Sequence, residues 1–139
     1  MQLAKHLDVK RPREEAAALV AREDTLPALF PQAKTEIIDR REDRTTMRAH
    51  YRALGRDGTA TFHFDSLPDG GLRFEKVCDG RVWRELEGTV CFETHGGGTR
   101  VRIELNGRTK SLVPEIAIRG AMQEQLEEMA GALREILET

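Results

Sequence analysis

Two cations lie among the apolar residues of a pair of strand-like runs in the segment RFEKVCDGRVWRE, positions 73–85. Alternate residues of a strand share a face, so Lys76 falls on the face of Phe74, and Arg84 on the face of Leu86. An unpaired charge on a buried face is costly in free energy, so these cations need a partner or retained water. We interpret them as ligand-binding residues for a carboxylate, phosphate or phenolate on an otherwise apolar molecule.

The same pattern is compatible with cations that do not bind a ligand. A β-bulge would turn one of the two side chains outward. Lys76, near the end of a hairpin, would alternatively extend its amine to water. The acid expected to compensate them on the inner face is Glu36, on a neighbouring but not adjacent strand.

Tyr51 lies in the middle of the same expected inner face. It would either hydrogen-bond a ligand or act as a core aromatic residue with its hydroxyl at a rim. On the opposite face, His50, His63 and Glu75 form a set of the kind that binds zinc or iron. A convex, solvated surface lacks the water exclusion of a metal centre, so we predict no metal site there.

Signals of nucleophilic catalysis are missing from the sequence. Ser66 and Ser111 are the only serines, and neither lies near a credible base. Cys78 and Cys91 lack zinc-ligand spacing and are interpreted as ordinary thiols. The glycine run at 95–98 joins two strands, which predicts a hairpin turn in place of a phosphate-binding loop. We predict no catalytic residue and no cofactor.

The elements that must position these residues follow from hydrophobic periodicity and turn signals. Residues 2–10 predict a strand, 13–23 a helix with acids in its first turn, and 25–30 a second short helix. Residues 34–109 are typical of strands separated by Gly- and Asp-rich turns. The tail 114–137 predicts a long helix, because its apolar residues recur at three- and four-residue steps.

This order predicts an α+β fold: a seven-stranded curved antiparallel sheet wrapped around a long C-terminal helix, with two short helices after the first strand. The helix has one apolar stripe, which would cover one face of the sheet. With 139 residues, the chain is expected to form one domain, 1–139.

Hairpin closure and side-chain pairing predict the strand register. The expected cross-strand pairs are Tyr51–Phe62, Ala49–Phe64, His50–His63, Phe64–Phe74, Asp65–Arg73, His63–Glu75, Leu72–Leu86, Arg73–Glu85, Phe92–Val101, Val90–Ile103, Glu93–Arg100 and Glu85–Arg108. The outer face then carries a row of alternating charge: Arg48, Asp65, Arg73, Glu85 and Arg108.

Two further residues have alternative interpretations. Trp83 falls on the expected outer face, either as a homodimer contact or as a half-covered ring. Gly120 interrupts the long helix, and we favour tight packing of the helix on the sheet. The alternative for Gly120 is close approach of a ligand, or a flexible helix end that gates a cavity.

Composition excludes some classes of partner. The chain is 33% charged with a formal net charge of −2, which does not indicate nucleic-acid binding. No run approaches the 18 apolar residues typical of a membrane span, and the N-terminal residues lack the apolar stretch of a signal peptide. We expect a cytoplasmic protein without stable membrane association.

The chain resembles the START-like, or SRPBCC, superfamily of polyketide cyclase/dehydrase and lipid-transfer proteins. Three stretches carry the resemblance: REEAAALVAREDTLPALFP, RFEKVCDGRVWRELEGTVCFE and PEIAIRGAMQEQLEEMAGALREIL. The resemblance covers essentially the whole chain and implies the helix-grip fold. It also implies a deep, largely apolar cavity that holds a small hydrophobic or amphipathic molecule. The superfamily has no universal catalytic motif, so no catalytic residue is carried over.

Ligand binding is therefore the leading functional hypothesis. Lys76, Arg84 and Tyr51 would orient one polar end of the ligand. The expected apolar walls are Phe62, Phe64, Phe74, Leu86, Val90, Ile103, Met122 and Leu126.

Two alternatives remain. A cyclase or aromatase would use Tyr51 or Arg84 to polarise a carbonyl or stabilise an enolate, although no paired acid and base is expected in the cavity. An interaction module, resembling superfamily members that bind a heat-shock chaperone, would have a filled interior and a partner surface around Trp83. The protein is thus more readily interpreted as a binder than as an enzyme.

Overall fold

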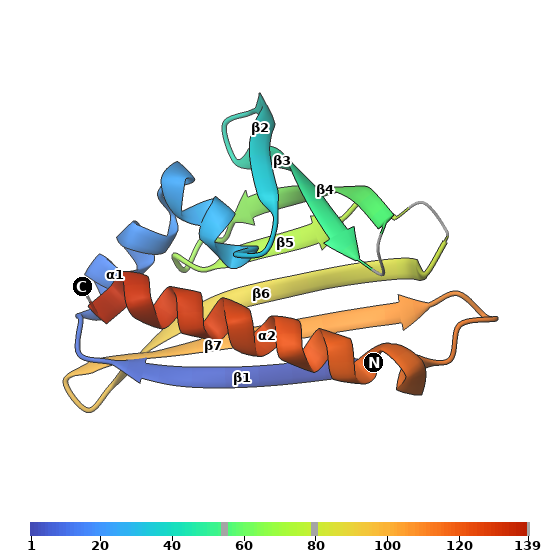
Figure 1. Cartoon of the computed structure of the whole chain (residues 1–139). Coiled ribbons are helices and arrows are strands. Elements are labelled where there is room, and N and C mark those ends of the chain that lie inside the picture. Colours follow the sequence, from blue (N-terminus) through green and yellow to red (C-terminus); the bar gives the residue numbers. More distant parts are fainter. Residues whose placement is uncertain (54–55, 79–80, 139) are drawn as a thin grey trace.

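The structure, a computed structural model, describes residues 1–53, 56–78 and 81–138. Strands and helices alternate early in the chain and give way to a long run of strands before the final helix (Figure 1). Their bounds are β1 Gln2–Val9, α1 Arg13–Val20, the 3₁₀ helix η1 Glu23–Leu29, β2 Lys34–Arg40, β3 Arg44–Ala53, β4 Arg56–Ser66, β5 Leu72–Lys76, β6 Trp83–His95, β7 Gly98–Thr109 and α2 Glu115–Glu138.

The seven strands form one antiparallel sheet in the order β1-β7-β6-β5-β4-β3-β2. In Figure 1, α2 crosses one face of the sheet beside β1 and β7, and α1 lies near its C-terminal end. The predicted fold class is confirmed in its strand number, its two short helices and its long C-terminal helix. Among the described residues, no helix combines the length and apolar character needed to cross a lipid bilayer.

The core lies between the sheet and the C-terminal half of α2. Every third or fourth residue of that half is buried, as the apolar periodicity of the helix predicts: Leu126, Met129, Leu133 and Leu137. Val90, Val101 and Ile103 on β6 and β7 are fully buried in the same core cluster. Each fully buried aliphatic side chain stabilises the fold by about 1.5–3 kcal/mol.

Two hairpins have the predicted register. Phe64 pairs with Phe74 and His63 with Glu75 between β4 and β5. Between β6 and β7, Phe92 pairs with Val101, Val90 with Ile103, Glu93 with Arg100 and Glu85 with Arg108. Gly96 and Gly97 form the turn of this second hairpin with φ of 55° and 83°, a left-handed conformation that favours glycine.

Two other predicted registers are wrong. Phe62 pairs with Met47 in place of Tyr51, and His63 pairs with Thr46 in place of His50, because β3 and β4 already pair at Ala53–Arg56. The expected closure at Leu54 lies outside the described residues.

The hairpin from β5 to β6 also differs. Leu72 pairs with Val90 and Arg73 with Thr89, so Leu86 and Glu85 lie beyond the paired part of β5. Each error displaces a partner by four positions, an even number, and an even shift leaves every side chain on its predicted face.

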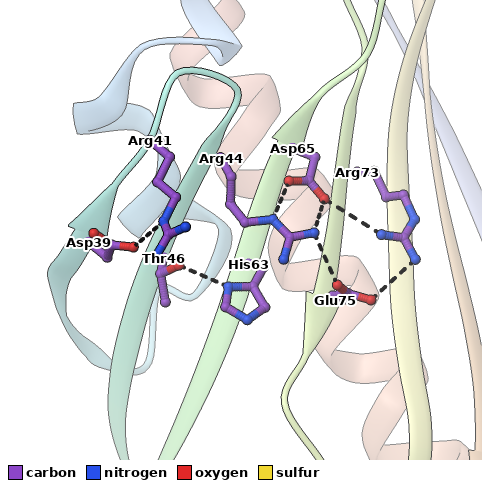
Figure 2. Close-up of polar contacts among 8 residues, drawn as sticks. All are labelled: Asp39, Arg41, Arg44, Thr46, His63, Asp65, Arg73 and Glu75. Atoms are coloured by element: carbon purple, nitrogen blue, oxygen red, sulfur yellow. Dashed lines mark hydrogen bonds and ion pairs between the residues drawn. The ribbon is translucent and has the colours of Figure 1, made fainter.

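The outer face keeps the predicted pairs Asp65–Arg73 and Glu85–Arg108 of the charge row, but a different arginine joins Asp65 in a polar network. Figure 2 shows Arg44 donating to both oxygens of Asp65, at 2.7 and 2.9 Å, and approaching Glu75 at 3.4 Å. Arg73 bridges Glu75 and Asp65 at 3.3 and 3.6 Å and also bonds Glu87. Arg48 is not part of this network because the corrected register places Arg44 opposite Asp65.

Gly120 does not mark close packing, contrary to the favoured interpretation. A Cβ atom added to Gly120 would meet no atom within 4 Å, setting aside the nearby backbone of the helix itself. The reason is that α2 enters the buried core only from Leu126 onward, whereas residues 119–121 are exposed.

Candidate functional site: a cavity between the sheet and helix α2

A cavity of about 450 Å³ lies between the sheet and the middle of α2, residues 121–129. Its volume falls within the range of small-molecule sites in proteins. The sheet contributes Ala49, Ala60, Phe62, Phe74 and Leu105, among others; α2 contributes Ala121, Met122 and Met129, among others; Phe30 closes the wall after η1. The predicted hollow is therefore present, and most of its lining is apolar.

Small residues on the inner face create this space. Ala49 and Ala60 pair with each other across β3 and β4 and present only methyl groups. Phe74 lies directly over Gly88 of β6, where an added Cβ would come within 2.3 Å of the ring. The absence of a side chain at Gly88 lets the ring lie against the sheet, so the volume in front of it stays open.

Lys76 stands at the mouth of the cavity. It lines both the cavity and a more open groove outside it, as Tyr51 does. Within the described part of the chain, the Lys76 ammonium group has no ion pair or hydrogen bond, and the side chain is half-buried. A cation in this position can bind an anionic group while its ammonium group stays hydrated. Because Lys76 lines the cavity, its predicted orientation agrees with the structure.

Arg84, the second predicted cation, does not face the cavity. The register of β6 against β7 shifts between Trp83 and Glu85, which makes Arg84 an extra residue in its strand. Such a bulge reverses the alternation of side chains on the near side of the extra residue. Arg84 is consequently exposed, and Trp83 lines the cavity in its place.

Trp83 is thereby moved from the predicted outer face to the interior. Only 7% of the residue is exposed, so it offers no surface for a dimer or a chaperone. Its ring packs over Gly107, where an added Cβ would come within 2.4 Å of Cζ3. No periodic pattern could have signalled this position, because the bulge that produces it leaves no mark in the alternation of residue types.

The remaining predicted wall residues divide into two groups. Phe62, Phe74, Leu86 and Met122 line the cavity as expected. Phe64, Val90, Ile103 and Leu126 are buried but do not line it, because they belong to the solid part of the core. Phe64 packs against Phe74 and Phe30, with ring centroids 5.9 and 6.2 Å away.

The polar groups of α2 that border the cavity were missed by sequence reasoning. Glu124, Gln125 and Glu128 line it, the two acids one helical turn apart. Their spacing was visible in the sequence, but which face of α2 meets the cavity was not. Glu36, the acid expected on the inner face of the sheet, is exposed instead. Its Oε1 lies 3.7 Å from Nη1 of Arg48 and 3.2 Å from Nε2 of His50.

The set of His50, His63 and Glu75, at which we predict no metal site, is not brought together. His50 pairs with Thr59, and His63 accepts or donates a 2.8 Å hydrogen bond with Thr46. In the described residues, no cluster of three His, Cys, Asp or Glu side chains has the arrangement of a metal site.

The thiol groups lie away from the cavity lining as well. Neither Cys78 nor Cys91 forms a disulfide within the described residues, and neither lines the cavity; the Cys78 thiol donates to the Lys76 carbonyl at 3.6 Å. Burial raises the pKa of the Cys91 thiol above its ordinary value, which keeps it protonated and disfavours a role as nucleophile.

Comparison with known proteins gives structural matches only. No protein-family model and no curated protein matches the sequence. The Zhui aromatase/cyclase of a Streptomyces species superposes with a TM-score of 0.80 at 15% identity, covering 96% of this chain and 90% of that one. A START superfamily protein from Mycobacterium smegmatis gives 0.76 at 18% identity, covering 98% and 96%.

A STAR-related lipid transfer protein from Xanthomonas axonopodis is also similar, with a TM-score of 0.68, 13% identity, and coverage of 98% and 85%. Together with the sheet order and the long C-terminal helix, these similarities establish a START-like helix-grip fold. At such identities they define the class of architecture and not the ligand or the reaction.

Proposed function

We propose that this protein binds a small hydrophobic or amphipathic molecule in the cavity between the sheet and α2. The observation that carries the proposal is a cavity of about 450 Å³ with mostly apolar walls and one unpaired cation, Lys76, at its mouth among the described residues. Apolar walls supply affinity through buried area, and a few polar groups fix the orientation of the ligand. An anionic end would lie at Lys76, with the apolar body inside.

The chain offers a matched pair of cations for testing this proposal. Lys76 and Arg84 are eight residues apart in sequence, but only Lys76 lines the cavity. Naphthoate is a suitable probe, because it joins an aromatic body to a carboxylate. Its binding can be followed by the fluorescence of Trp83, the only tryptophan of the chain, which lines the cavity wall.

We expect naphthoate to change the Trp83 emission saturably. Lys76→Met should weaken this binding about tenfold or more, because hydrogen bonds to charged groups contribute about 1.5–3 kcal/mol. Arg84→Leu removes the same charge outside the cavity and should leave the affinity within about twofold of wild type. If neither naphthoate nor any retained hydrophobic molecule is detected by fluorescence and native mass spectrometry, the binding proposal is wrong.

A cyclase-type reaction in the same cavity is the second candidate. The carboxylates of Glu124 and Glu128 favour it, since they supply the acid–base groups that the sequence alone did not place there. Incubation with a short poly-β-ketone and mass analysis of the recovered material would decide between the two. A dehydrated, cyclised product that disappears in Glu128→Gln indicates catalysis, and unchanged recovery indicates a binder.

We also propose a cytoplasmic location for the protein, as expected from the sequence. The proposal does not include an interaction module centred on Trp83, because this residue is buried in the cavity wall.

A further inference from the structure

Trp83 carries a hydrogen-bond donor that the protein itself does not satisfy. The residue is more than nine-tenths buried, yet among the described residues the indole Nε1–H has no acceptor. Buried tryptophan N–H groups ordinarily find a partner, because an unsatisfied buried donor costs as much as a lost hydrogen bond. Trp83 also lies outside the main core cluster, so its unpaired donor belongs to the cavity and not to the packed interior.

The edge of the Trp83 ring that packs against Gly107 is not the edge that carries the donor. The atoms of Trp83 nearest Gly107 are Cζ3, Cε3 and Cη2, all on the benzo edge of the indole. Nε1 belongs to the opposite, pyrrole edge. Gly107 therefore packs against the edge of the ring that does not carry the donor, and the N–H belongs to a side chain that lines the cavity.

Trp83 also lies farther inside than Lys76. Lys76 lines both the cavity and the outer groove, whereas Trp83 lines only the cavity. The two side chains therefore offer two donors at different depths: a charged one at the mouth and a neutral one within.

We propose that Trp83 Nε1–H donates a hydrogen bond to an acceptor oxygen within the body of the ligand. The inference rests on the proposed binding function and specifies the ligand class. It is an apolar molecule that carries a carbonyl, ether or similar oxygen inside the cavity, in addition to any anionic end at Lys76. A pure hydrocarbon body would leave the indole N–H unpaired in an apolar site, so the cavity discriminates against it.

Two probes of nearly equal size and shape test this preference. Acetylnaphthalene carries a neutral ketone oxygen, and ethylnaphthalene has a hydrocarbon group in the same place. Both lack the charge that would engage Lys76. In calorimetric titrations of the wild-type protein, we expect acetylnaphthalene to bind about threefold to tenfold more tightly, which is the usual range for one neutral hydrogen bond.

Trp83→Phe removes the N–H but retains an aromatic ring over Gly107. We expect this variant to lose the preference for acetylnaphthalene while its affinity for ethylnaphthalene stays close to that of wild type. Arg84→Leu serves as the control. It should keep the preference for the ketone, because Arg84 is exposed and does not line the cavity.

A spectroscopic measurement needs no substitution. A single tryptophan gives a single indole N–H signal in a proton–nitrogen correlation spectrum. A hydrogen bond to the ketone should move this signal downfield, and ethylnaphthalene should not produce that movement. The spectrum therefore decides the matter even if Trp83→Phe does not fold.

The outcomes separate the two proposals. Equal affinities for the two probes, together with an indole signal that responds identically to both, overturn the role of Trp83 and leave the binding function standing. Failure of both probes and of naphthoate to bind overturns the binding function and, with it, the role of Trp83.

Discussion

Phe74 and Gly88 show how one missing side chain shapes the cavity. The phenyl ring lies across the strand on the glycine backbone, which leaves the volume above it unfilled. An alanine at Gly88 would place its methyl group 2.3 Å from the ring, and the ring would have to move away from the sheet. The direction away from the sheet is toward the cavity.

We therefore expect Gly88→Ala to lower the free energy of unfolding by about 1–3 kcal/mol, the usual cost of overpacking. It should also weaken naphthoate binding, because the displaced ring occupies ligand volume. Urea denaturation and fluorescence titration measure the two effects. Adding Phe74→Leu should restore part of the loss, and strictly additive effects of the two substitutions would contradict a steric origin.

Asp8 is the residue whose ionisation we expect to influence stability on the far edge of the sheet. Two hydrogen bonds from Arg100, at 2.8 and 3.2 Å, join β1 to β7. The side-chain hydrogen bond from Arg100 lowers the pKa of Asp8 below its ordinary 3.8. A depressed carboxyl pKa stabilises the folded state above the unfolded pKa, and this stabilisation is lost as the pH falls through the folded value.

Asp8→Asn should therefore reduce the free energy of unfolding at pH 7 by an amount that shrinks to zero as the pH falls below 3.8. The size of the effect is small, since the pair is exposed. Arg100→Gln removes the donor and should reproduce the same pH dependence. A difference between wild type and Asp8→Asn that persisted unchanged in acid would exclude this pair as its origin.

At the scale of elements, the two halves of α2 have different tasks. The C-terminal half from Leu126 is packed into the core, and only its first turn, at Glu128 and Met129, also borders the cavity. The other cavity-lining residues of α2 lie before it, at 121–125. The N-terminal half is held less by packing: Ile116 is 85% exposed, and Glu115 pairs with the chain's N-terminal amine at 3.1 Å. This division explains why an apolar stripe of constant periodicity has buried residues at one end and half-buried ones at the other.

Gly120 provides a test of this division. Because nothing lies within 4 Å of its added Cβ, Gly120→Ala should raise the free energy of unfolding by about 0.5–1 kcal/mol through helix propensity alone. Gly131 has the same open surroundings in the packed half, so Gly131→Ala is the matched control with the same expected gain. A loss of stability at Gly120 alone, measured by thermal denaturation, would show that the helix is packed there.

The bulge in β6 determines which side chain of this strand faces the cavity. The bulge places Trp83 on the inner face of the sheet and Arg84 on the outer face, the reverse of the prediction. The cavity wall therefore has a neutral donor where a cation was predicted. Among the described residues, β6 pairs here only with β7, since its pairing with β5 extends only as far as Glu87. A backbone hydrogen bond from the Lys110 N–H to the Val82 carbonyl, at 2.8 Å, joins the segment before β6 to the residue that follows β7.

The protein as a whole retains a cavity in a place where a packed apolar core would make the folded state more stable. Ala49, Ala60 and Ala121 line this space, although larger apolar side chains would bury more area. Such an arrangement is typical of a site in which function limits stability.

Ala60→Leu should therefore stabilise the protein by about 0.5–2 kcal/mol and abolish naphthoate binding, because the added side chain fills ligand volume. Ala130→Leu is the control: Ala130 is buried in the core cluster away from the cavity lining, so the same enlargement should destabilise the protein by about 1–3 kcal/mol. Chemical denaturation with and without naphthoate gives both quantities. A destabilised Ala60→Leu that still binds the probe would mean that this volume is not the binding site.

The sequence by itself determined the elements, their order and the face of most strand residues. Periodicity and turn chemistry act over a few residues, and a strand keeps its faces even when its register shifts by an even number, as at Phe62 and Leu72. Lys76 and Phe74 could be assigned to the cavity for this reason. The tertiary structure alone decided the rest: the bulge that turns Trp83 inward, the side of α2 that brings Glu128 to the cavity, and the solid packing around Ile103. These depend on how whole surfaces meet, and the free energy of that fit is not contained in any local pattern.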